Sequence, residues 1–397
     1  MKISTDKQKI EELLTRGVEN IYPKPEFLDA RLKEGKQLKL YTGYDPTAPT
    51  LHIGHGITML KLRQFQDLGH KVIMLIGDFT GKIGDPTDKT SARVQLTDGQ
   101  IKENLKEYKK QASSILNFKG KNKVEVKYNS KWLSKMNLDD FMGLAEHFTV
   151  PRLLERDMFQ KRLKEGKTIH LHEFLYPVMQ AYDSVAMNVD GEVGGNDQTF
   201  NMLAGRELMK DVSKKEKFVL TGKLLTDSSG KKMGKTEGNM IALSDSPEDM
   251  FGKVMSWTDG MIVNGFELCT IIPMVEVKEI EKSLESGGNP RDYKLKLAYE
   301  VVKTFLSEDG AKKGQANFEK VIQSKDKPEE IKELTPSKFD IITVLVEAGF
   351  VKSTTEARQN IKGGGVKVND KKIEDHAVEV KTGDIVQKGK RFFVKIK

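Results

Sequence analysis

The sequence predicts an α/β protein with a parallel-sheet domain first, an α-helical domain second and a small α+β domain last. Between residues 38 and 128, strand-like and helix-like stretches alternate, which is typical of a parallel sheet with right-handed crossovers. Residues 246–325 are mainly helical in pattern, and a polar linker rich in Lys and Glu follows and ends near Pro336. We therefore expect domains at residues 1–226, 227–330 and 337–397.

The first domain begins with an amphipathic helix, because Ile10, Leu13 and Leu14 recur at helical spacing. The alternating elements that we then expect are strand 38–43, a helix from His55, strand 71–76, helix 98–116 and strand 124–128. An insertion at approximately residues 130–190 has a mainly helical pattern. Strands resume near residues 192–194 and 218–220.

The two later domains have their own start and stop signals. In the second, Pro247 suits the first turn of a helix, and the Gly, Asn and Pro residues at 287–290 end another. In the third, we expect helices at 341–349 and 353–362, followed by short strands after the GGG at 363–365.

The bulk composition indicates a soluble, basic protein. Charged residues make up 31% of the 397 residues, and the mean hydropathy is −0.50. The longest uninterrupted apolar run, residues 72–76, is far shorter than the roughly 20 residues of a membrane span, so we expect no membrane association and no export signal. Because Cys269 is the only cysteine, an intrachain disulfide and a cysteine-cluster zinc site are excluded, and a reducing cytoplasm is the simplest location.

The positive charge is concentrated near the end of the chain. The net charge is +8, and residues 336–397 contain 13 Lys and Arg against 8 Asp and Glu. A basic terminal module is typical of a polyanion binder, although a solubilising surface would have the same composition.

The most informative motif is PTAPTLHIGH, at residues 46–55, between an expected strand and an expected helix. The first N–H groups of a helix have no internal partner, and the helix dipole is positive there, so a triphosphate suits this position. Gly54 permits close approach of a nucleotide, and His52 and His55 can donate hydrogen bonds to its phosphate or ribose oxygens.

A second motif, KMGKT at residues 232–236, places Lys232 and Lys235 in a segment after an apolar strand. Alone it would read as a solvated basic loop. Together, HIGH and KMGKT resemble the HIGH and KMSKS signatures of class I aminoacyl-tRNA synthetases. Gly234 and Thr236 depart from the two serines of that signature, while both charged lysines remain.

This resemblance implies a Rossmann-like catalytic domain that uses ATP, with Mg²⁺ carried by the nucleotide and no metal site in the protein. The catalytic residues that it implies are Thr47, His52, His55, Lys232 and Lys235. The ATP-binding residues that it implies are Asp45, Gly54, His55, Gly195, Asp197, Lys232, Met233, Lys235 and Thr236. Lys89 and Arg93 resemble residues that meet pyrophosphate or the end of the tRNA.

Longer motifs resemble the tyrosyl-tRNA synthetases over essentially the whole chain. These motifs are LYTGYDPTAPTLHIGH, GDFTGKIGDPTDKTSAR, YPVMQAYDSVAMNVDGEVGGNDQTFN and KMGKTEGN. The resemblance implies activation of L-tyrosine by ATP to tyrosyl-adenylate and pyrophosphate, then transfer of the tyrosyl group to the 3′-terminal adenosine of tRNA(Tyr).

The implied tyrosine site makes chemical sense. Tyr176, Gln180 and Asp183 are spaced i, i+4 and i+7, so one helical face presents all three. The family pattern gives Tyr41 and Asp183 to the phenol hydroxyl and Tyr176 and Gln180 to the ammonium. If phenylalanine were bound in such a pocket, the polar groups that face the phenol would have no partner. Tyrosyl-tRNA synthetases are themselves the established example of this discrimination between tyrosine and phenylalanine. Asp85 would help to hold the ammonium, and Gln198 would line the same pocket.

Residues 337–397 resemble the S4 RNA-binding fold through STTEARQNIKGGGVKVNDKKI and GDIVQKGKRFF. The residues that would contact RNA phosphates are Arg358, Lys362, Lys367 and Lys390. Family membership also implies a homodimer formed through the inserted region around residues 139–164, where Phe148, Leu153 and Phe159 could supply apolar surface.

Three alternatives remain open at this point. A tryptophanyl-tRNA synthetase shares both signatures, although Asp183 and the S4-like tail favour tyrosine. A small nucleotidylyltransferase shares H-x-G-H but leaves the helical region and the tail unexplained. An RNA-binding protein without activity would not need HIGH and both loop lysines. Trp132 and Trp257 indicate packing alone.

Overall fold

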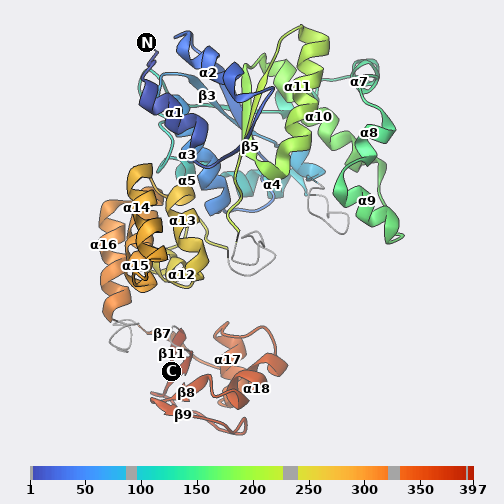
Figure 1. The fold of residues 1–397 in the computed structure, drawn as a ribbon. Coiled ribbons are helices and arrows are strands. Elements are labelled where there is room, and N and C mark those ends of the chain that lie inside the picture. Colours follow the sequence, from blue (N-terminus) through green and yellow to red (C-terminus); the bar gives the residue numbers. More distant parts are fainter. Residues whose placement is uncertain (1–2, 86–95, 227–239, 321–330, 390–391) are drawn as a thin grey trace. The chain divides into compact units, whose positions relative to one another are not determined.

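The computed structural model describes residues 3–85, 96–226, 240–320, 331–389 and 392–397 (Figure 1). The chain divides into two compact units, residues 1–311 and 312–397, which we describe separately. The expected boundary between a catalytic and a helical domain, at residues 226 and 227, falls at the edge of the described residues and stays a prediction.

The first unit is built on a six-stranded sheet in the order β1-β6-β5-β2-β3-β4. Its strands are β1 (Val18–Tyr22), β2 (Lys39–Tyr44), β3 (Lys71–Ile76), β4 (Glu125–Tyr128), β5 (Gly191–Gly195) and β6 (Phe218–Gly222). Five of these strands are parallel, as expected, with Tyr41 of β2 opposite Ile73 of β3 and Glu192 of β5. The sequence analysis missed β1, which pairs antiparallel with β6 at the edge of the sheet.

The crossovers place helices on both faces of this sheet. The helices of this part are α1 (Lys7–Thr15), α2 (Pro25–Lys33), α3 (Ile53–Asp67), α4 (Asp98–Leu105), α5 (Tyr108–Ala112), α6 (Ser130–Leu133), α7 (Leu138–Ala145), α8 (Val150–Leu154), α9 (Asp157–Lys164), α10 (Leu171–Met187) and α11 (Thr199–Ser213). From the centre of the sheet, the β2-α3-β3 and β5-α11-β6 units run in opposite directions, so right-handed crossovers put α3 and α11 on opposite faces (Figure 1). The strand order therefore reverses between β2 and β5, where ligands of such sheets bind.

The single helix expected at residues 98–116 is two helices in the structure, α4 and α5. Both of them contact the loop after β2. Side chains from both helices hold the loop after β2: Asn104 donates to the Pro46 carbonyl at 2.7 Å, and Tyr108 donates to the Ala48 carbonyl at 2.7 Å. Gln111 accepts from the Leu51 backbone N–H at 2.7 Å. These bonds fix the backbone that leads into α3.

The inserted region corrects one expectation about apolar surface. Leu153 and Phe159 are buried within this chain, so they do not supply exposed surface. The apolar side chains that are exposed there include Leu138, Met142 and Val150, at 74%, 61% and 65% exposure.

The rest of the chain is helical and then mixed, as expected. The helices that follow the sheet are α12 (Pro247–Met255), α13 (Ile262–Cys269), α14 (Met274–Glu285), α15 (Pro290–Phe305) and α16 (Glu308–Phe318). The second unit has α17 (Ile341–Glu347) and α18 (Thr354–Lys362) beside a sheet in the order β7-β11-β10-β8-β9. Its strands are β7 (Lys332–Leu334), β8 (Val366–Val368), β9 (Lys371–Lys372), β10 (Ile385–Lys388) and β11 (Phe392–Ile396). No helix in the described ranges is long and apolar enough to cross a membrane.

Candidate active site

The HIGH motif lies at the turn from β2 to α3, as expected, and α3 begins at Ile53, two residues earlier than predicted. The backbone N–H of His52 donates to Nδ1 of His55 at 3.1 Å, and the two imidazole rings lie 3.8 Å apart between centroids. Both histidines are half-buried. The turn therefore presents two imidazoles together at the helix N-terminus, where the dipole favours an anion.

A cavity of about 780 Å³ opens beside this turn. It is lined by His52 and Gly54 from the HIGH turn and by Gly194 and Gly195 from the end of β5. A Cβ at Gly195 would stand 2.5 Å from an Asp197 carboxylate oxygen, so a larger residue there would displace the Asp197 side chain. The cavity thus brings together predicted ATP-binding residues from both sides of the point where the strand order reverses.

A continuous chain of hydrogen bonds links the predicted carboxylates on the other side of β2. Tyr176 donates to Asp45 at 2.8 Å, and Thr80 donates to the other oxygen of Asp45 at 2.8 Å. The Asn129 side-chain amide donates to Thr80 at 3.0 Å and to Asp183 at 3.3 Å. Asp45, which the sequence associated with ATP, is therefore tied to the residues expected to bind tyrosine.

Asp183 is the most deeply buried of the expected carboxylates, at 2% exposure. Its second oxygen accepts from the Trp132 indole N–H at 2.7 Å, so both oxygens are fixed by the protein. Burial raises the pKa of Asp183 well above its usual range, and the bonds from Trp132 and Asn129 oppose that rise. A carboxylate held in this way has little freedom to turn away from a ligand.

The remaining tyrosine-site residues come from several elements and converge. Gln198 donates to Asp85 at 2.7 Å, and the Arg156 guanidinium lies 3.6 Å from the same carboxylate. Burial, and then the charges of Asp45 and Asp85, raise the pKa of the Tyr176 hydroxyl. Tyr176 thus lies where the predicted carboxylates concentrate negative potential.

Tyr41 and Gln180 contact two further polar residues, Ser184 and Glu192, which are buried. The Tyr41 hydroxyl lies 2.9 Å from the Ser184 hydroxyl, and Gln180 donates to Glu192 at 3.2 Å. Among the described residues, the side-chain oxygen of Gln180 is buried and has no hydrogen-bond partner. An unpaired buried acceptor is costly unless a ligand donates to it.

Several residues that make these contacts were not predicted from the sequence. Asn129 directly follows β4, and a polar residue at the carboxyl end of a parallel strand was a usable signal. Trp132 lies in α6, and we had expected it to contribute packing alone. Thr80, Ser184 and Glu192 carried no signal of their own, because only tertiary contacts distinguish them from ordinary polar residues.

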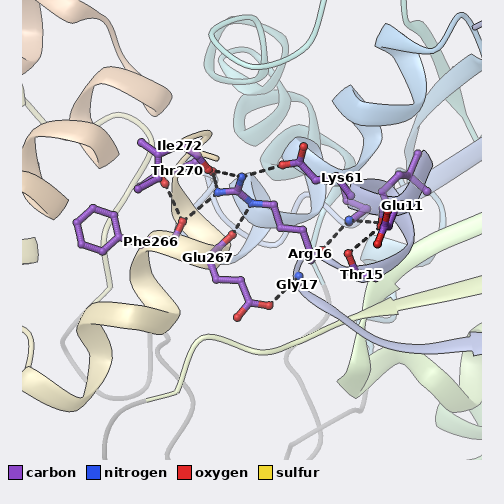
Figure 2. Close-up of polar contacts among 11 residues, drawn as sticks. Glu11, Thr15, Arg16, Gly17, Lys61, Phe266, Glu267, Thr270 and Ile272 are labelled. Carbon is purple, nitrogen blue, oxygen red and sulfur yellow. Dashed lines mark hydrogen bonds and ion pairs between the residues drawn. The ribbon is translucent and has the colours of Figure 1, made fainter. Parts of the chain in front are cut away.

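A second buried polar cluster joins α1 to α3 and α13 (Figure 2). The Arg16 guanidinium donates to the backbone carbonyls of Phe266, Glu267, Thr270 and Ile272 and to the Glu12 carboxylate, which accounts for its five N–H groups. These carbonyls lie at and just beyond the last turn of α13, where helix carbonyls lack internal partners.

Lys61 extends this cluster from α3, the helix that carries HIGH. Its ammonium donates to the carbonyls of Leu13 at 2.9 Å and Arg16 at 2.7 Å, at the end of α1 (Figure 2). Neither Arg16 nor Lys61 belonged to the predicted motifs. They connect the HIGH helix to the helical part of the same unit.

The remaining predicted residues are exposed or lie outside the described chain. Thr47 is exposed in the loop after β2. Arg358, Lys362 and Lys367 are exposed on α18 and β8, while Ala357 and Ile361 of α18 face the core. The predicted residues outside the described ranges are Lys89, Arg93, Lys232, Met233, Lys235, Thr236 and Lys390. Cys269 is buried, as expected.

Two family models match this chain. Residues 33–323 match the family model of tRNA synthetases class I (W and Y), and residues 341–386 match that of the S4 domain. The chain is 42% identical over 395 residues to the tyrosine–tRNA ligase of Haemophilus ducreyi, covering 98% of this chain and 99% of that protein. It is 42% identical over 391 residues to the tyrosine–tRNA ligase of Thermotoga maritima, covering 97% and 96%.

Solved structures share the fold of the first part of the chain. A truncated mitochondrial tyrosyl-tRNA synthetase from Aspergillus nidulans superposes with a TM-score of 0.66 at 24% identity, covering 78% of this chain and 93% of that one. A tyrosyl-tRNA synthetase from Archaeoglobus fulgidus, in complex with L-tyrosine, gives a TM-score of 0.60 at 21% identity, covering 78% and 99%. At these identities the likeness is one of fold.

Proposed function

From the premise that this chain belongs to the tyrosine–tRNA ligase family of class I tRNA synthetases, we propose how its residues divide the reaction. The enzyme activates tyrosine with ATP and transfers it to tRNA. The observation that carries the assignment of the amino-acid pocket is the fixed carboxylate of Asp183, held by Trp132 and Asn129 near Tyr41.

In this proposal, Asp183 accepts the hydrogen of the substrate phenol and Tyr41 donates to its oxygen. Because both protein groups are buried, phenylalanine would deprive each of them of its phenol partner and leave them only the contacts that the protein supplies, and that loss disfavours it. Tryptophan would also offer an N–H to Asp183, but its indole has no acceptor for the Tyr41 hydrogen.

The substrate ammonium is assigned to Tyr176, Gln180 and Asp85, with Gln198 orienting Asp85. Support comes from the unpaired side-chain oxygen of Gln180 and from the hydrogen bond between Gln198 and Asp85. An ammonium donates three hydrogens and accepts none, so a set of oxygen acceptors suits it.

For ATP, the proposed residues are those around the HIGH cavity together with the KMGKT segment. The tyrosine carboxylate is already a nucleophile, so its attack on the α-phosphorus needs no protein base, and catalysis comes from positioning and charge stabilisation. We assign these roles to Thr47, His52, His55, Lys232 and Lys235. Mg²⁺ bound to the nucleotide would neutralise phosphate charge, in keeping with its preference for phosphate oxygens.

The S4 domain is the proposed tRNA-binding module, with Arg358, Lys362, Lys367 and Lys390 as phosphate contacts. A homodimer in the cytoplasm is also part of the proposal. The exposed apolar side chains Leu138, Met142 and Val150 of the inserted region support association.

The function is tested by exchange of pyrophosphate into ATP with tyrosine, tryptophan and phenylalanine supplied separately. We expect rapid exchange with tyrosine, exchange with phenylalanine only at a far lower kcat/KM, and none with tryptophan. Exchange driven by tryptophan would overturn the assignment of Asp183 and Tyr41 to a phenol, and silence with all three would contradict the first half-reaction.

The role of the KMGKT segment predicts a selective effect of Lys235→Ala. Loss of a transition-state charge contact should lower the single-turnover rate of adenylate formation by about 10²-fold, with little change in tyrosine affinity. Rapid-quench measurement checks the rate, and equilibrium titration checks the affinity. An unchanged rate would remove Lys235 from the mechanism.

The role of the second unit predicts that removal of residues 337–397 weakens tRNA charging while sparing amino-acid activation. Activation serves as the internal control for folding of the remaining chain. Charging that is unchanged at physiological salt would contradict the proposed RNA contacts.

A further inference from the structure

We propose that Ser184 is a positioning residue for substrate selection: held by the buried Lys217–Glu192 pair, it turns the Tyr41 hydroxyl hydrogen toward the substrate phenol. The inference rests on the proposed role of Tyr41 and extends it to a second layer of residues. Tyr41, Ser184, Glu192 and Lys217 are all buried, at 0%, 0%, 2% and 0% exposure.

The Lys217 ammonium can only donate hydrogen bonds. It donates to the Ser184 hydroxyl at 2.8 Å and to the Glu192 carboxylate at 2.5 Å. Burial lowers the pKa of Lys217, and the nearby Glu192 charge opposes that change. Ser184 therefore accepts a hydrogen bond from one fixed direction.

A serine hydroxyl that accepts from Lys217 still has one hydrogen to donate. Its other described side-chain contact is the Tyr41 oxygen at 2.9 Å, so the Ser184 hydrogen goes to Tyr41. The Tyr41 oxygen is then occupied as an acceptor, and its own hydrogen must point elsewhere. The direction of the Tyr41 hydrogen therefore follows from which of the four buried groups donate hydrogen bonds and which accept them.

In the structure the Tyr41 hydroxyl is hydrogen-bonded to Glu192 as well as to Ser184. In the proposed complex, the substrate phenol oxygen competes with Glu192 for the Tyr41 hydrogen. Glu192 already accepts from Gln180 through one oxygen and from Lys217 through the other. A carboxylate served by two donors attracts a third more weakly than a bare one. The pair therefore leaves the hydrogen available to the phenol, whose own hydrogen goes to Asp183.

The test is the ratio of kcat/KM for tyrosine to kcat/KM for phenylalanine in pyrophosphate exchange. We expect Ser184→Ala to lower this ratio about fivefold, the effect of one hydrogen bond, through a higher KM for tyrosine. The phenylalanine constant should stay unchanged, because phenylalanine does not use the Tyr41 hydrogen. Equal losses for both amino acids would mean a purely structural role and would overturn the inference.

Thr42→Val is the matched control. Thr42 neighbours Tyr41 on β2, is buried, and donates its hydroxyl hydrogen to the Val193 carbonyl at 2.6 Å. Its replacement removes a buried hydroxyl from the same strand without touching Tyr41. We expect this variant to keep the wild-type ratio, and a ratio as low as that of Ser184→Ala would contradict a specific role for Ser184.

A double-mutant cycle with Tyr41→Phe separates this inference from the proposed function. Tyr41→Phe should lower the ratio, and adding Ser184→Ala should then change it no further. If Tyr41→Phe matters but Ser184→Ala lowers the ratio equally in both backgrounds, Ser184 does not act through Tyr41 and the inference fails alone. If Tyr41→Phe leaves the ratio unchanged, the proposed role of Tyr41 fails and the inference fails with it.

Discussion

Two buried lysines in the first unit, Lys61 and Lys217, have different kinds of partners for their ammonium groups. Lys217, beneath the tyrosine pocket, has an acidic partner in Glu192 and a hydroxyl partner in Ser184. Lys61, on the HIGH helix, is bound by the carbonyls of Leu13 and Arg16, and the Arg16 guanidinium lies close enough to disfavour its charge. Lys217 therefore forms an ion pair with a carboxylate, whereas the hydrogen-bond acceptors of Lys61 are uncharged carbonyls.

Burial lowers the pKa of both lysines, but the largest neighbouring charge acts in opposite directions. Arg16 adds to the effect of burial on Lys61, whose pKa is lowered to about 7, whereas Glu192 opposes the effect of burial on Lys217. A neutral amine keeps two N–H donors, which is enough for its two carbonyls. Lys61 can therefore lose its proton without losing a partner. Lys217 is coupled to a carboxylate, so losing its charge would leave Glu192 buried beside a neutral group. Burial alone therefore does not determine how much a lysine contributes to folding stability.

The largest predicted effect breaks the ion pair. Lys217→Met should destabilise the protein by about 3–5 kcal/mol, because Glu192 is left buried without a cation. Urea unfolding followed by circular dichroism measures the loss. The double variant Lys217→Met, Glu192→Gln should recover most of it. A loss below about 1 kcal/mol in the single variant would mean that the pair is not a compensated unit.

A smaller loss is expected at the other lysine. Lys61→Met should cost about 1–3 kcal/mol at pH 7, because two carbonyls lose their donor but no buried charge is left behind. The same unfolding experiment measures it. A loss as large as that of Lys217→Met would erase the distinction between the two sites.

The smallest expected effect, stated per pH unit, is the change with pH in the contribution of Lys61 to folding stability. The pKa of Lys61 is about 7 in the folded chain and near 10.5 when unfolded, so between these values the unfolded state binds more protons. Its contribution to folding stability should therefore rise with pH across that window. The stability of wild type relative to Lys61→Met should increase from pH 7 to 9, with a slope that approaches about 1.4 kcal/mol per pH unit above about pH 8. A flat difference would show that Lys61 keeps its proton when buried.

The sequence was sufficient for the parts of the fold that have periodic signals. The buried run of β3, the turn into the HIGH helix and the inward face of α10 all followed from spacing. The strand β1 was missed because VENIY has no clear alternation and its partner, β6, is about 200 residues away. Local patterns cannot report such a distant pairing.

The site was predictable only where residues belong to motifs. Asp183 and Tyr176 were found by resemblance to the family motifs, and helical spacing placed them on one face. The bond from Tyr176 to Asp45 depends instead on how α10 packs against the loop after β2. Nothing in the sequence distinguishes Lys61 and Lys217 from the other lysines of this lysine-rich chain. Only their tertiary surroundings distinguish them, and these surroundings have no local sequence signature.

The central claim is that the fixed Asp183 carboxylate selects the substrate phenol, and equilibrium binding without ATP tests it most directly. Calorimetric titration should compare L-tyrosine with L-phenylalanine for wild type and Asp183→Asn. We predict that wild type strongly prefers tyrosine and that Asp183→Asn reduces this preference about 10- to 100-fold, the effect of losing a charged hydrogen bond. An unchanged preference in Asp183→Asn would contradict the account.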